Sequence, residues 1–248
     1  MSFDKLRFDD GPYPRARLGF VAVANAGLTE GDMFAMCPPG VGLSFTRVRM
    51  QTACTVASLS GMERDLGDAL ATLSPGRQDL DVLCYNCTAG SFVIGEDKII
   101  AMIEATRPQG RATTLLSGVH AALRAVGARR VAMATAYTDD INELEKAHFT
   151  RQGFDVVNLA GLGLLTDVEM NRVSPDCLMD FARHVDRPEA DALFISCGAL
   201  RSTGIVETLE RELGKPVIGS NQASMWNCLR LAGIRDRMAG FGSLLRDH

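Results

Sequence analysis

A short segment occurs twice in this chain of 248 residues. Asp81-Val-Leu-Cys-Tyr-Asn-Cys87 and Asp191-Ala-Leu-Phe-Ile-Ser-Cys197 share an Asp at the first position, a Leu at the third and a Cys at the last. The apolar run before each final Cys is typical of a buried strand, and the small residues after it are typical of a turn. The repeat therefore predicts two similar halves, each with one cysteine at the end of a strand.

A second repeated pair supports the duplication. Leu123-Arg-Ala-Val-Gly127 and Leu229-Arg-Leu-Ala-Gly233 both end in a glycine, the residue that most often follows the last turn of a helix. A weaker match joins the strand-like stretches that begin at Arg17 and Arg130. Both halves are thus expected to share one arrangement of strands and helices.

The fold class follows from the alternation of short apolar runs with amphipathic stretches. Residues 115–126 and 141–151 have the three-and-four spacing of helices. This alternation predicts an α/β fold with two pseudosymmetric halves, each a mostly parallel sheet flanked by helices. Ligands of such sheets bind at the carboxyl ends of the strands, so we expect the active site in the cleft between the halves. The expected strands are residues 18–24, 41–48, 81–86, 131–136, 192–196 and 216–219.

The duplication also predicts how the chain is divided. Residues 1–115 and 220–248 are expected to form the first half, which carries Cys87. Residues 116–219 are expected to form the second half, which carries Cys197. No low-complexity linker separates them, so the halves should be closely packed.

The composition argues against several partners. The formal net charge is −4 and the basic residues are scattered, so no nucleic-acid partner is expected. No apolar run approaches the roughly 20 residues of a membrane span, and the N-terminus is charged where a signal peptide needs an apolar stretch. We therefore expect a cytoplasmic protein with reduced thiols and no membrane partner. Whether the chain forms a homo-oligomer stays open.

Two of the seven cysteines stand out by position. A Cys between a strand and a helix N-terminus meets unpaired N–H groups, which favour a thiolate or a bound carboxylate. Because Cys87 and Cys197 occupy duplicated positions, we interpret them as a catalytic pair and expect a lowered pKa for at least one thiol. The other cysteines are expected to be ordinary small residues: Cys37, Cys54, Cys84, Cys177 and Cys228.

Cys84-Tyr-Asn-Cys87 is also a CxxC sequence, for which redox and zinc sites are alternatives. No second CxxC occurs, and the four histidines form no spaced motif. Positions three apart on a strand point to opposite faces, so Cys84 is expected in the core and away from Cys87. We therefore expect no metal, with a metal or dithiol centre as the lesser alternative.

Tyr137 follows the expected strand 131–136, where it can either donate a hydrogen bond into the cleft or simply pack. Asp139 and Asp140 come next and are more typical of a helix start than of paired catalytic acids.

Several stretches resemble the aspartate/glutamate racemase superfamily, within it the branch of arylmalonate decarboxylase and maleate cis-trans isomerase. They are Gly127-Ala-Arg-Arg-Val-Ala-Met-Ala-Thr-Ala-Tyr-Thr-Asp-Asp-Ile-Asn142, Ser196-Cys-Gly-Ala-Leu200 and Gly214-Lys-Pro-Val-Ile-Gly-Ser-Asn221, and the similarity extends over most of residues 15–245. The resemblance implies an enzyme without metal or organic cofactor that acts on a small carboxylic acid. It also implies substrate binding by Thr88, Ala89 and Tyr137. The backbone N–H groups after both cysteines are expected to add to these donors, which places Gly198 at the substrate as well.

The resemblance separates the branches of the family. Arylmalonate decarboxylases keep a cysteine like Cys197 but have a small residue where this chain has Cys87. Both thiols are present here, as in maleate isomerases and racemases. The expected function is therefore a cofactor-independent isomerase with a cysteine pair, first of the maleate cis-trans type. The alternatives, in order, are an amino-acid or hydantoin-type racemase, an arylmalonate-type decarboxylase and a non-catalytic protein that binds small acids.

The chain departs from the maleate isomerases at two positions that hold a dicarboxylate there. Maleate isomerases carry an Asn in an N-terminal Ser-Ser-Asn stretch. The counterpart in this chain is Asn25, which stands one position earlier than that Asn. A second Asn is replaced by Asp167. We expect Asn25 and Asp167 at the substrate, and segments 26–40 and 162–175 to close over the site and set its specificity.

Overall fold

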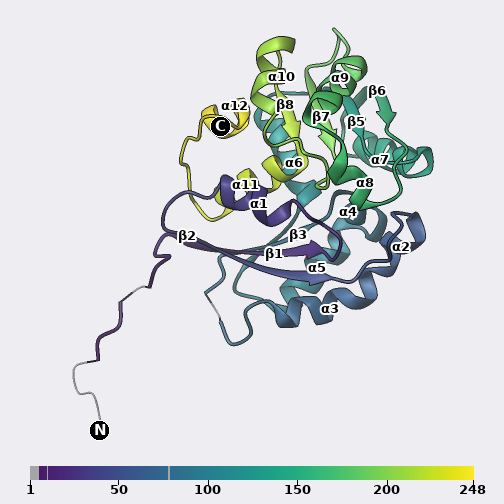
Figure 1. Cartoon of the computed structure of the whole chain (residues 1–248). Coiled ribbons are helices and arrows are strands. Elements are labelled where there is room, and N and C mark those ends of the chain that lie inside the picture. The colour runs from purple at the N-terminus through teal and green to yellow at the C-terminus, as the bar shows by residue number, and fades with distance from the viewer. Residues whose placement is uncertain (1–5, 10, 78) are drawn as a thin grey trace.

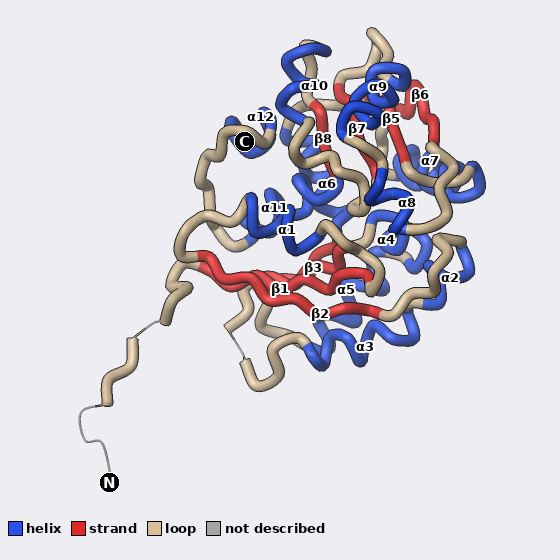
Figure 2. The backbone as a smooth tube through the Cα atoms, viewed as in Figure 1, coloured by secondary structure: helices blue, strands red, loops and turns tan. Residues whose placement is uncertain are grey.

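The computed structural model describes residues 6–9, 11–77 and 79–248. It contains two four-stranded parallel sheets, which lie in separate parts of the molecule (Figures 1 and 2). The first has the order β2-β1-β3-β4 and the second β6-β5-β7-β8. The strands are β1 (Ala16–Val23), β2 (Val41–Val48), β3 (Val82–Asn86), β4 (Arg111–Thr114), β5 (Arg130–Thr135), β6 (Asp155–Gly161), β7 (Ala192–Ser196) and β8 (Val217–Gly219). The predicted α/β architecture of two similar halves is confirmed.

The aspartates of the repeated segment have the same role in both sheets. The Asp81 carboxylate accepts a hydrogen bond of 2.7 Å from the backbone N–H of Arg17 on β1. The Asp191 carboxylate accepts one of 2.8 Å from the backbone N–H of Arg130 on β5. Each aspartate therefore fixes the strand of its cysteine against the first strand of its own sheet.

Helices surround the sheets and fill the space between them (Figure 2). They are α1 (Thr29–Ala35), α2 (Val56–Gly61), α3 (Glu63–Thr72), α4 (Thr88–Ile94), α5 (Glu96–Thr106), α6 (Leu115–Ala125), α7 (Asp139–Arg151), α8 (Asp167–Arg172), α9 (Pro175–Val185), α10 (Val206–Leu213), α11 (Ser220–Leu231) and α12 (Gly242–Asp247). No helix in the described ranges has the length and apolar character needed to cross a membrane.

The two helices of the second repeat, α6 and α11, pack against each other and contact strands of both sheets. Their close approach depends on Gly118, because a Cβ there would lie only 3.0 Å from the carbonyl oxygen of Ala223. One buried cluster joins these helices to both sheets and includes Phe20, Leu116 and Phe194. The division of the chain at residues 115/116 and 219/220 stays a prediction, since both helices belong to the contact between the halves.

The sequence predicted most of the sheet correctly. Gly127 and Gly153 follow α6 and α7 with φ angles of 75° and 86°, as expected of glycines after a helix. Two strands were not predicted. Strand β4 is short, and β6 is an edge strand whose side chains are mostly half-buried. Strand β6 lacks a continuous apolar run because it is covered only in part.

Candidate active site

The two repeated cysteines lie at the carboxyl ends of corresponding strands. Cys87 follows β3 and caps α4, and its Sγ accepts a hydrogen bond of 3.2 Å from the N–H of Gly90. Cys197 follows β7, and its Sγ accepts one of 3.4 Å from the N–H of Ala199. Cys197 also has a φ of 128°, a conformation that costs an L-residue free energy and often occurs at functional sites.

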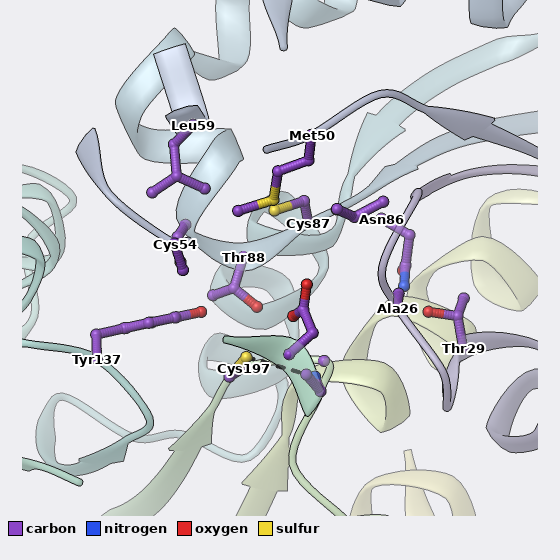
Figure 3. Close-up of a pocket in the computed structure, with 15 residues that line it drawn as sticks. Ala26, Thr29, Met50, Cys54, Leu59, Asn86, Cys87, Thr88, Tyr137 and Cys197 are labelled. Atoms are coloured by element: carbon purple, nitrogen blue, oxygen red, sulfur yellow. Dashed lines mark hydrogen bonds between the residues drawn. The ribbon is translucent and has the colours of Figure 1, made fainter. Parts of the chain in front are cut away.

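Both cysteines line a single pocket between the halves (Figure 3). The pocket contains about 400 Å³ of space free of atoms, part of it open to solvent. Of the predicted site residues, the structure brings together Cys87, Thr88, Ala89, Tyr137, Asp167, Cys197 and Gly198. The remaining lining residues are Val23, Ala26, Thr29, Met50, Cys54, Leu59, Asn86 and Ala199.

Asn25 is the predicted site residue that does not line this pocket. After β1 the chain turns, with the N–H of Ala26 donating to the carbonyl oxygen of Val23. The turn puts Ala26 and Val23 at the pocket, while the Nδ2 of Asn25 donates a 3.2 Å hydrogen bond to the carbonyl oxygen of Gln51. The substrate-binding role of Asn25 stays a prediction, and the structure places this residue in the turn beside the pocket.

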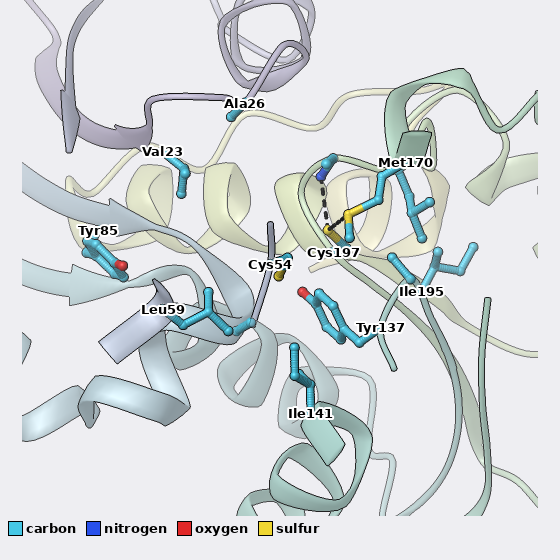
Figure 4. Close-up of a cluster of buried hydrophobic side chains, with 14 of the residues drawn as sticks. Val23, Ala26, Cys54, Leu59, Tyr85, Tyr137, Ile141, Met170, Ile195 and Cys197 are labelled. Atoms are coloured by element: carbon cyan, nitrogen blue, oxygen red, sulfur yellow. Dashed lines mark hydrogen bonds between the residues drawn. The ribbon is translucent and has the colours of Figure 1, made fainter. Parts of the chain in front are cut away.

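Tyr137 and Thr88 supply hydroxyl groups at the pocket. Tyr137 is 2% exposed, and its hydroxyl points into the pocket near Thr88 and Cys197 (Figure 3). The same hydroxyl also lies close to Cys54 (Figure 4). Tyr137, Cys54 and Leu59 line the pocket and also belong to a buried apolar cluster (Figure 4). The site thus combines a few hydroxyl and N–H donors with a largely apolar lining, as small-molecule sites commonly do.

The pKa values of both thiols differ from the sequence expectation. Burial raises the pKa of Cys87 to about 12, although the N–H of Gly90 acts in the opposite direction. Burial also raises the pKa of Cys197 well above its ordinary value, and the nearby Asp167 carboxylate adds to this effect. The expected lowering of one thiol pKa is wrong for this structure, because the loss of hydration outweighs the hydrogen bonds.

Asp167 stands at the start of α8 and brings a carboxyl group into the pocket. Its Oδ2 is buried without a hydrogen-bond partner among the described residues. Burial raises its pKa. The unsatisfied oxygen therefore remains available to a ligand that offers a hydrogen-bond donor or a positive charge.

The segments expected to cover the site both contribute to the pocket, and each contains a short helix, α1 or α8. Residues 26–40 supply Ala26 and Thr29, while residues 162–175 supply Asp167. Met170 on α8 contacts Cys197, with 3.7 Å between the two sulfur atoms (Figure 4).

Cys54 is a pocket residue that the sequence reasoning missed. It is 6% exposed, lies in an irregular stretch before α2, and is joined to the second half by a backbone hydrogen bond to Leu165. Burial raises the pKa of its thiol to about 12. Neither a repeat nor a strand end marks Cys54 in the sequence, so its position depends on this contact between the halves.

Three possible metal ligands meet elsewhere, at Glu96, His120 and His148, with ligand atoms within 4.8 Å of one another. The Glu96 carboxylate already accepts hydrogen bonds from Thr114 and Ser117. The two imidazole rings are stacked, with 15° between their planes. Nearly parallel rings do not direct their nitrogen lone pairs at one point, so this cluster fits a structural hydrogen-bond network better than a metal centre.

The fold and the pocket define a class of protein: two similar α/β halves that each bring one cysteine to a shared cleft. The chain belongs to the arylmalonate decarboxylase family, whose family model matches residues 78–245.

Curated relatives lie in two branches of this family. Arylmalonate decarboxylase of Bordetella bronchiseptica is 38% identical over 136 residues, which are 54% of this chain and 56% of that protein. Maleate isomerase of Nocardia farcinica is 28% identical over 244 residues, which are 93% of this chain and 95% of that protein.

A solved structure from the maleate branch is also similar. It is a cysteine-to-serine mutant of Nocardia farcinica maleate cis-trans isomerase with a covalently bound succinylcysteine intermediate. The TM-score is 0.83 at 26% identity, and the match covers 94% of this chain and 99% of that one.

Proposed function

We propose that this chain is a cofactor-independent isomerase that uses Cys87 and Cys197 on a small carboxylic acid, by maleate-type cis-trans isomerisation. The observation that carries this proposal is that the two thiols, one from each half, line the same pocket. The maleate isomerase relative, which matches over nearly its whole length, supports this reaction. The succinylcysteine intermediate named for the structural neighbour supports a covalent cysteine mechanism.

The pocket offers donors for a substrate carboxylate. The hydroxyl of Tyr137 and the backbone N–H groups of Ala89 and Gly198 are the proposed donors. The hydroxyl of Thr88 joins them when it turns from the Oγ of Ser220 to the substrate carboxylate. Charge that develops beside the carboxylate during the reaction needs such donors, which are worth most in a site that excludes water. Tyr137 and Thr88 are buried, so this part of the pocket meets the condition.

In the proposed reaction, the Cys87 thiolate forms a C–S bond with one carbon of the double bond. The π electrons move to the neighbouring carbon, which is protonated by the Cys197 thiol. After rotation about the new single bond, the Cys197 thiolate removes a proton from that carbon, the C–S bond breaks and the trans acid leaves. The cycle returns Cys87 as thiolate and Cys197 as thiol. Cys87 must therefore lose its proton before it attacks, and its raised pKa makes this requirement strongly pH-dependent.

One observation favours a second function, the racemisation of an amino acid or a related derivative. Asp167 presents an unsatisfied carboxyl oxygen in the pocket. When ionised, this carboxylate repels a second substrate carboxylate but attracts an ammonium group. In that reaction one thiolate removes the α-proton and the other thiol protonates the opposite face of the same carbon.

Proton NMR in deuterated water distinguishes these reactions in one series of samples. Maleate, amino acids, hydantoins and arylmalonates are each incubated with the enzyme. Conversion of maleate to fumarate supports the proposal, and deuterium at an otherwise unchanged chiral centre supports the racemase. Loss of CO₂ from an arylmalonate points to decarboxylation, and binding without turnover points to a non-catalytic protein.

A cytoplasmic location is also part of the proposal. Reducing compartments keep thiols free, and the two-cysteine reaction requires both sulfurs in the reduced state. Oxidation that blocks turnover, with recovery after addition of dithiothreitol, is the expected behaviour.

A further inference from the structure

Two residues at the start of α11 connect the two cysteine turns. The Oγ of Ser220 accepts a hydrogen bond of 3.0 Å from the backbone N–H of Cys197. The same oxygen accepts one of 3.1 Å from the hydroxyl of Thr88, which directly follows Cys87. Ser220 is fully buried, so water does not replace these bonds.

Asn221 makes a second connection between the same turns. Its Oδ1 accepts a 3.1 Å hydrogen bond from the Nδ2 of Asn86, the residue before Cys87. Its Nδ2 donates to the carbonyl oxygen of Gly198, the residue after Cys197, at 2.9 Å, and to the carboxylate of Asp32 on α1 at 2.8 Å.

Neighbouring groups fix the orientation of the Asn221 amide. The Oδ1 of Asn86 accepts a hydrogen bond from Ser224, so Asn86 presents its Nδ2 to Asn221. Carboxylate and carbonyl oxygens only accept, so Asp32 and Gly198 both require the Nδ2 of Asn221. Asn221 is 1% exposed, and its two donors and its acceptor are all used.

The bond from Asn221 to Gly198 affects the sulfur of Cys197 through one planar peptide unit. The carbonyl of Gly198 and the N–H of Ala199 belong to that unit and point in opposite directions. With the carbonyl held by Asn221, the N–H of Ala199 is directed at the sulfur of Cys197, 3.4 Å away. Gly198 permits this approach, because a Cβ there would lie 2.8 Å from the Oδ1 of Asn221.

We infer that Asn221 is a positioning residue, which fixes the two cysteine turns relative to each other and directs the N–H of Ala199 at Cys197. The role of Cys197 as a reacting thiol rests on the function proposed above. The orientation of the N–H is independent of the substrate, so it can be tested through the reactivity of the thiol itself.

The test measures alkylation of each thiol by iodoacetamide, followed by mass spectrometry of the peptides, in the full-length protein. Asn221→Asp keeps the oxygen that faces Asn86 but loses both donated hydrogen bonds. We expect the alkylation rate of Cys197 to fall by about tenfold at fixed pH, because its thiolate loses a hydrogen bond. Cys87 serves as the internal control, and its rate should stay within about twofold.

A double variant separates the two bonds that Asn221 donates. Asp32→Asn with Asn221→Asp restores the hydrogen bond between positions 32 and 221 with donor and acceptor exchanged, while the bond to Gly198 stays absent. It also removes the repulsion between two carboxylates, so it serves as the test if Asn221→Asp alone does not fold. We expect Cys197 to alkylate slowly in the double variant and at the normal rate in Asp32→Asn.

A rate for Cys197 that is unchanged or higher in the double variant overturns the inference, whatever the enzyme turns over. If the cysteine reactivities change as expected but no tested acid is converted, the proposed function fails and the positioning role of Asn221 stands.

Discussion

The hydroxyl of Ser196, the residue immediately before Cys197, donates a hydrogen bond of 2.6 Å to the Oε1 of Glu145. Glu145 lies on α7 and is fully buried, and its other carboxyl oxygen has no partner within the described part of the chain. Burial raises the pKa of Glu145 from 4.5 to about 8. A neutral carboxylic acid therefore packs behind the strand end that carries Cys197 at pH 7.

Glu145→Gln should change how stability depends on pH. Because the folded-state pKa lies above the unfolded one, the contribution of Glu145 is fully present below about pH 4.5 and is lost as pH rises through about 8. Above pH 8 the variant should be more stable than the wild type, by on the order of 4 kcal/mol. Urea unfolding at pH 5 and pH 9 measures this. If the free energy of unfolding differs between variant and wild type by the same amount at pH 5 and pH 9, Glu145 is not a buried acid with a raised pKa.

The reactivity of Cys87 should rise steadily with pH. With its pKa raised to about 12, the thiolate fraction increases about tenfold for each pH unit between 7 and 9. Iodoacetamide alkylation of Cys87 in a Cys197→Ala variant measures this slope. A plateau below pH 9 would show that the thiolate is stabilised more strongly than burial allows.

Asp167→Asn tests which kind of substrate the pocket takes. Removal of a carboxylate beside a dicarboxylate relieves repulsion, so KM for maleate at pH 8 should fall by about tenfold. For an amino acid held by its ammonium group the same change should raise KM. Steady-state kinetics on both substrates decides between them, with Asp176→Asn, an exposed position on α9, as the control.

Glu96 should stabilise the contact between α5, α6 and α7 without a metal. Burial opposes its ionisation, but the contact with His148 at 3.2 Å, the hydrogen bonds from Ser117 and Thr114 and the nearby His120 outweigh burial and lower its pKa to about 2. This stability is present above about pH 4.5 and is lost as pH falls through about 2. Glu96→Gln should therefore cost about 2 kcal/mol at pH 7 and much less at pH 3.

Dialysis against a chelator checks the metal question for the same cluster. The Tm should stay unchanged, because the Glu96 carboxylate is held by hydrogen-bond donors. A Tm that falls with the chelator and returns with zinc would contradict this interpretation.

The sequence could predict what the repeat encodes. Asp81 and Asp191 each anchor a neighbouring strand, and the cysteines that follow lie at equivalent strand ends. Such features depend on a few consecutive residues, so a pattern of spacing identifies them. Position near a strand end left the role of Tyr137 open between hydrogen bonding and packing, and the family resemblance was needed to predict Tyr137 and Thr88 at the pocket.

The rest of the site depends on contacts between distant segments. Cys54 reaches the pocket because its stretch pairs with Leu165 in the other half, and no local pattern encodes that contact. Asn25 lies in the turn that follows β1, where its Nδ2 donates to the carbonyl oxygen of the distant Gln51. The thiol pKa values depend on how deeply both halves bury the sulfurs, which spacing does not reveal.

Mass spectrometry of single-cysteine variants incubated with maleate tests the central proposal most directly. Cys197→Ala should lose turnover by more than ~100-fold. It should also accumulate Cys87 with the added mass of one maleate, because no thiolate at position 197 removes the proton whose loss releases the trans acid. Cys87→Ala should lose turnover without forming an adduct. Cys54→Ala, which replaces the third pocket cysteine, serves as the control and should leave Cys87 and Cys197 reactive. Full turnover in both Cys87→Ala and Cys197→Ala, with no adduct on either sulfur, would contradict the two-cysteine account.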